Sequence, residues 1–166
     1  MQHQTCRTWK ENLMQTAFAM LISLQFLIIL LHDLVEIPGW SHSSQIQAVL
    51  GKHKLWAATL INSIFPGIAA AFAWYFWNRQ RPAYVDRYWL IYCAVTLLSA
   101  VAMWYLPYFL GASDAKKNEY QRFYAGTHQI LPARGNNPRP NLLHVIFHVV
   151  FAATLSLAFL INTRLI

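Results

Sequence analysis

The first long apolar stretch, NLMQTAFAMLISLQFLIILLHDLVE at residues 12–36, decides the class of fold. Its residues 13–30 carry no charged side chain, and as a helix they would cross most of a ~30 Å hydrocarbon layer. Three ionisable side chains, His32, Asp33 and Glu36, then follow within five positions, just before a Pro-Gly pair. We therefore predict a membrane-spanning helix whose last turn carries ionisable groups at the membrane interface.

The composition of the whole chain agrees with this first stretch. Of 166 residues, 57% are hydrophobic and 11% are charged, whereas soluble domains carry roughly a quarter charged residues. Three further stretches are long and apolar enough to span a membrane. We predict an all-α, polytopic membrane protein: a four-helix bundle forming a single domain over residues 1–166, with a long loop between the third and fourth helices. The predicted spans are 12–36, 55–78, 88–110 and 142–162.

The net charge of +7 does not indicate a nucleic-acid-binding protein, because the Lys and Arg residues flank the apolar spans. Basic flanks of this kind set orientation and contact anionic lipid headgroups, so the lipid bilayer is the expected partner. The short segments on the side of the termini have the higher density of basic residues, which predicts cytoplasmic termini. Two cysteines, Cys6 and Cys93, form neither a disulfide framework nor a metal-ligand spacing.

Several residues are predicted to shape the helices locally. Gly67 supplies a small side chain for close contact between helices, and Asp86 is a candidate N-cap of the third span. In the long loop, Ser113 is a candidate N-cap of a short helix over 114–125, whose aromatic residues suit the headgroup region. Asn141 is the candidate N-cap of the fourth span.

Four antiparallel spans place the end of the first helix and the start of the last on the same membrane face. His32 and Glu36 are four residues apart, as are His144 and His148, so each pair shares one helix face. Because the two helices run in opposite directions, we expect His32 to face His148, and Glu36 to face His144. Ionisable groups held this close to lipid are costly and indicate a functional site.

Two interpretations of this site remain open. In the first, the four residues bind a metal ion, with zinc or iron expected and a single haem between His32 and His148 less favoured. In the second, a carboxylate orients a histidine for metal-free proton transfer. The candidate metal ligands are His32, Glu36, His144 and His148, and the candidates for a catalytic role are Asp33, His128 and Asn62.

These patterns predict a small integral membrane enzyme that acts on a lipophilic or lipid-headgroup substrate at one membrane interface. The motifs HExxH, GxSxG and CxxC and the phosphate-binding P-loop do not occur in the chain, so no established catalytic class is indicated. The alternative is a transporter, a channel subunit or a membrane assembly factor without a catalytic site. A homo-oligomer or a larger membrane complex is compatible with either function.

Overall fold

The computed structural model describes residues 9–124 and 126–163, and these form helices and turns without a β-strand. Four helical stretches are long and apolar enough to cross a membrane, so the predicted all-α fold with four spans is confirmed. The spans are α1 (Trp9–Leu31), α3 (Lys52–Tyr75), α7 (Leu142–Thr163) and the continuous stretch made of α4 (Ala83–Ala100), the π-helix η1 (Val101–Tyr105) and α5 (Leu106–Leu110). Two short helices, α2 (Ser43–Leu50) and α6 (Asp114–Tyr124), lie between the spans.

The first span is shorter than predicted: α1 ends at Leu31 rather than at Glu36. Nδ1 of His32 donates to the carbonyl of Ile29, an acceptor that the next amide of a longer helix would have bonded. Pro38 and Gly39, the latter with φ of +76°, then reverse the chain. The prediction that His32 and Glu36 share one helix face is therefore wrong.

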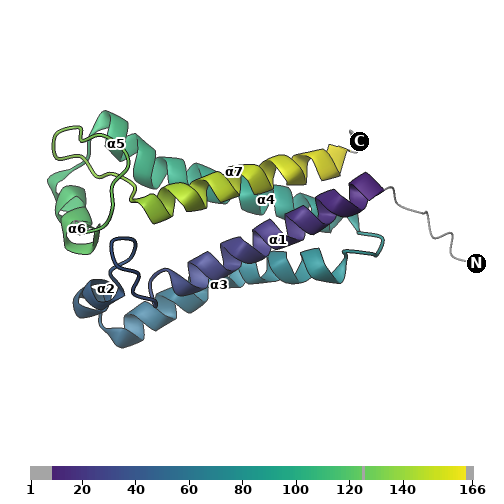
Figure 1. Ribbon diagram of the computed structural model, residues 1–166, viewed down its shortest axis with the longest axis horizontal. Helices are drawn as coiled ribbons and strands as arrows, with labels where there is room; N and C mark the ends of the chain where they lie inside the picture. Colours follow the sequence, from purple (N-terminus) through teal and green to yellow (C-terminus); the bar gives the residue numbers. More distant parts are fainter. Residues whose placement is uncertain (1–8, 125, 164–166) are drawn as a thin grey trace, which may run out of the picture.

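The spans pack as two pairs in contact with each other. The helix α1 contacts α3 and α7, and α4 also contacts α3 and α7 (Figure 1). Gly67 of α3 lies against Phe26 of α1, whose ring would be 3.3 Å from an added Cβ, so the predicted close contact at this glycine is confirmed. Further along, the rings of Phe18 and Trp89 lie 4.7 Å apart in the core. Close packing of this kind holds helices together in lipid, where apolar burial gives little driving force.

The predicted helix starts are partly confirmed. Ser113 caps α6, because its Oγ accepts a hydrogen bond from the backbone amide of Lys116 at 3.3 Å. Position 125, the predicted end of this helix, lies outside the described residues, which show α6 as far as Tyr124. The predicted cap at Asp86 is wrong: α4 begins at Ala83, and Asp86 accepts a hydrogen bond from Arg81 at 2.8 Å.

A layer made of α2, α6 and the following loop lies at the end of the bundle where α1 ends and α7 begins (Figure 1). Two hydrogen bonds join α2 and its N-cap to the α6 region: Gln45 donates to the carbonyl of Arg122 at 2.6 Å, and Nε2 of His42 donates to the carbonyl of Gly126 at 3.1 Å. The loop after α6 is held in turn by the hydroxyl of Tyr108, which donates to the carbonyl of Pro132. This layer lies over the residues that begin α7.

Candidate functional site

His32 and Asp33 form a pair at the end of α1. Nδ1 of His32 lies 3.1 Å from the carbonyl oxygen of Ile28 and 2.9 Å from that of Ile29. A carbonyl can only accept, so Nδ1 carries a proton. Nε2 lies 3.2 Å from Oδ1 of Asp33, and two lone pairs at that distance require one proton between them. Burial raises the pKa of the Asp33 carboxyl, while the neighbouring His32 opposes that shift.

Asn141 fixes the position and the tautomer of His144 at the start of α7. Its Oδ1 accepts from the backbone amide of His144 at 3.0 Å, so the predicted N-cap is confirmed. Its Nδ2 donates to the carbonyl of Trp40, which establishes the orientation of the amide. The same Oδ1 lies 2.6 Å from Nδ1 of His144, which must therefore carry the proton. Nε2 of His144 is left as an acceptor, and no described residue donates a hydrogen bond to it.

His148 lies one turn further along α7, with its Nδ1 at 3.2 Å from the hydroxyl of Tyr105. Tyr105 reaches it because the third span contains a π-helix, closed by a hydrogen bond from the amide of Leu106 to the carbonyl of Val101. Pro107 has no amide proton to continue regular α-helical bonding, which is the local cause of the irregularity. The wider turn directs two successive side chains, Trp104 and Tyr105, toward α7.

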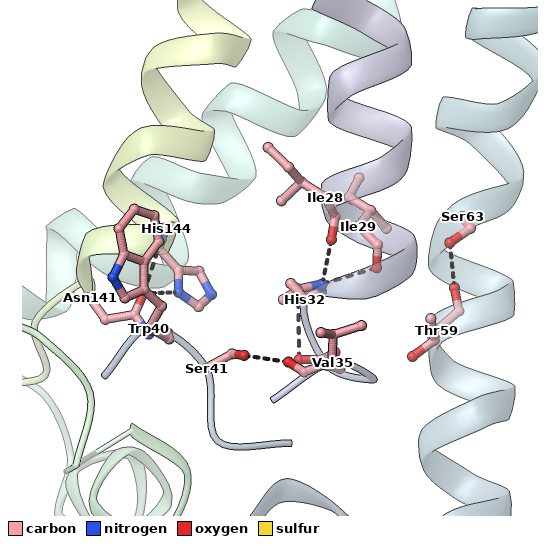
Figure 2. A network of polar contacts seen from close by, with 11 residues as sticks. Ile28, Ile29, His32, Val35, Trp40, Ser41, Thr59, Ser63, Asn141 and His144 are labelled. Atoms are coloured by element: carbon pink, nitrogen blue, oxygen red, sulfur yellow. Dashed lines mark hydrogen bonds and ion pairs between the residues drawn. The ribbon is translucent and has the colours of Figure 1, made fainter. Parts of the chain in front are cut away.

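Aromatic rings enclose His144 on several sides. The ring centroid of Trp104 lies 4.2 Å from that of His144, and Tyr124 from α6 lies 5.4 Å away. The rings of His32 and His148 are each 6.2 Å from His144. Figure 2 shows His144 and Asn141 at the start of α7 on one side and His32 at the end of α1 on the other. The predicted contact between the first and last spans is thus confirmed, but His32 faces His144 rather than lying level with His148.

Three predicted site residues lie apart from this cluster. Glu36 is exposed and caps α2, accepting from the hydroxyl of Ser43 at 3.1 Å and from the amide of Ser44 at 2.8 Å. The hydrogen bond from the Ser44 amide is the main reason that the pKa of Glu36 is lowered. Asn62 is exposed on α3, and His128 is exposed in the loop after α6, with its ring against Gly39. The structure brings together His32, Asp33, His144 and His148 from the predicted set.

A cavity of about 380 Å³ opens beside these residues. Asp33, Tyr124, His144 and His148 contribute polar groups to its lining, while α4, η1 and α7 contribute apolar side chains such as Met103, Phe147 and Phe151. Burial raises the pKa of Tyr124, which keeps its hydroxyl protonated at neutral pH. The cavity therefore combines polar groups near the end of α1 and the start of α7 with a mainly apolar lining along the spans, where Thr96 and Ser99 add two hydroxyl groups. An amphiphilic ligand fits this distribution of groups.

The four predicted metal ligands, His32, Glu36, His144 and His148, do not come together around one point. Within residues 9–124 and 126–163, no three His, Cys, Asp or Glu side chains are placed to share one metal ion. Glu36 is turned toward α2, where its carboxylate accepts from the amide of Ser44, so it is not available as the carboxylate ligand of the histidines. A haem between His32 and His148 fits poorly, because the ring of His144 lies 6.2 Å from each of them and competes for the same space.

No protein-family model, curated protein or solved structure matches this chain.

Proposed function

We propose that the chain is an integral membrane enzyme that carries out acid–base chemistry on a lipophilic or lipid-headgroup substrate bound in the cavity. The observation that supports this most strongly is the state of His144. Asn141 holds its Nδ1–H, and its Nε2 remains an acceptor beside the cavity. A histidine that is oriented through one nitrogen and open at the other has the arrangement of a general base.

Asp33 is the proposed acid of the same site. It lines the cavity together with His144, and burial raises the pKa of its carboxyl. Two titratable groups whose surroundings favour a neutral base and a protonated acid are a recurrent basis for proton transfer near pH 7. In this proposal His144 accepts a proton from the substrate or from a water at Nε2, Asp33 donates one, and His32 positions Asp33.

The experiment is a comparison of lipid conversion by matched variants. The full-length chain is reconstituted into vesicles made from the total membrane lipids of the producing cells, and the lipids are followed by mass spectrometry. We expect one lipid class to be converted by the wild type and by His53→Phe, which changes an exposed histidine of α3. His144→Phe should abolish this conversion. Conversion that is equal in His144→Phe and the wild type would overturn the proposal, as would no difference between wild-type and protein-free vesicles.

Zinc or iron at this site is the alternative to metal-free chemistry, and elemental analysis of the purified protein distinguishes the two. Cytoplasmic termini would place the site at the membrane face away from the cytoplasm. A transporter, a channel subunit or an assembly factor is the alternative, but no contact among residues 9–124 and 126–163 favours it. The buried polar pair in the core, Gln25 and Thr154, does not line the cavity.

A further inference from the structure

The charged groups around the cavity neutralise one another. Asp33, Lys116 and Glu119 are the charged side chains that line it. Nζ of Lys116 lies 3.3 Å from a carboxylate oxygen of Glu119, and Asp33 shares a proton with His32 at 3.2 Å. A phosphate or carboxylate group entering the cavity would lose its water without meeting an uncompensated positive charge, which is costly. The lining therefore favours a neutral ligand.

Nε2 of His144 can accept a hydrogen bond, and a ligand in the cavity must supply the donor. Because Nδ1 carries the proton, Nε2 can only accept, and no described residue donates to it. Ether, ester and ketone oxygens cannot serve as donors, whereas a hydroxyl group can. The hydroxyl of Tyr124 lines the same region and is able to donate to the oxygen of such a group.

A small hollow adjoins the cavity at this point. Its volume is about 10 Å³, and it shares Asp33, Tyr124, His144 and Ile46 with the larger cavity. A space of that size holds one water-sized group with several polar neighbours. It can take a single hydroxyl, and it is too small for a phosphate or a sugar.

The larger cavity suits the apolar body of the same molecule. Met103, Phe147 and Phe151 line it along the spans. Its volume of about 380 Å³ is near the lower end of the range for ligand pockets, which fits one chain or one ring system rather than a complete two-chain phospholipid. We infer that the cavity binds a neutral lipid with one hydroxyl group, of the class of isoprenoid alcohols and sterols, whose O–H donates to Nε2 of His144. This inference names the substrate class of the proposed enzyme and in that respect rests on the proposed function.

The test uses three probes that differ only at the head. The full-length protein in a neutral detergent binds radiolabelled farnesol, and unlabelled farnesol, farnesyl methyl ether and farnesyl monophosphate compete for the site. We expect farnesol to compete about tenfold better than the ether, which cannot donate, and the monophosphate to be no better than the ether. In His144→Phe the alcohol should lose this advantage, while His53→Phe should retain it.

The comparison of probes on the wild type needs no variant, so it stands even if His144→Phe fails to fold. Equal competition by alcohol and ether, strongest competition by the monophosphate, or no saturable binding of farnesol would each overturn the inference. The vesicle experiment separates this failure from failure of the proposed function. If a phosphate-bearing lipid is converted and its conversion depends on His144, the proposed enzymatic function is supported and the inferred hydroxyl-bearing ligand is overturned. Farnesol binding without any His144-dependent conversion would support the ligand class and overturn the enzyme.

Discussion

Replacing Asn141 by alanine removes three hydrogen bonds that hold the start of α7. The side chain is 2% exposed, accepts from the amide of His144 at 3.0 Å and from its Nδ1 at 2.6 Å, and donates to the carbonyl of Trp40 at 3.2 Å. Loss of an N-cap costs about 1 kcal/mol, and each of the two other partners left without a bond costs about 1 kcal/mol. We expect Asn141→Ala to lower the free energy of unfolding by about 3 kcal/mol.

Thermal unfolding in detergent, followed by tryptophan fluorescence, measures this loss. For a chain of this length the expected fall in Tm is on the order of 10 °C. Asn136→Ala, in the exposed loop, is the matched control and should stay within about 0.5 kcal/mol of wild type. Equal Tm values for Asn141→Ala and Asn136→Ala would refute the assigned hydrogen bonds.

Three other variants test the fold around the site. The folded-state pKa of Asp33 is raised, so the stability it contributes is present in acid and declines as the pH rises. Asp33→Asn should therefore gain Tm relative to wild type between pH 4 and pH 8, and a constant difference would contradict this. The pKa of Glu36 is lowered, so Glu36→Gln should reduce Tm slightly at pH 7, and this difference should shrink as the pH falls through the folded-state pKa, because wild type then loses the same interaction. Gly67→Leu should cost about 1–3 kcal/mol by overpacking against Phe26, with Gly67→Ala much milder; equal unfolding midpoints for the two would exclude close contact there.

The four spans follow from the sequence because each needs only length and apolar composition. Length and apolar composition do not predict the residue at which α1 ends. Leu34 and Val35 continue the apolar pattern beyond His32, so hydropathy extends the helix to Glu36. The structure ends it at Leu31, where the His32 side chain bonds the last carbonyls. Because α1 ends five residues earlier than predicted, Glu36 lies outside the helix and away from the histidines.

The sequence also does not predict that aromatic rings surround His144. The aromatic residues at the end of the third span suited a belt at the membrane interface, and those of α6 suited an amphipathic helix on the headgroups. Pro107 is a visible signal for a disturbed helix, but a proline alone does not say which side chains the disturbance redirects. Only the packed structure places Trp104 and Tyr124 against His144. By contrast, the cap at Asn141 and the contact between the first and last spans were predictable, because both depend on local sequence and topology.

Nitrogen-15 NMR of the histidine-labelled protein measures the protonation of His144 itself, with its signals identified by their loss in His144→Phe. We predict that His144 is neutral and carries its proton on Nδ1. We also predict that farnesol shifts the signal of the unprotonated Nε2 and that farnesyl methyl ether leaves it in place. A proton on Nε2 of His144, or an equal response to both probes, would exclude the hydrogen bond from the ligand hydroxyl to this nitrogen.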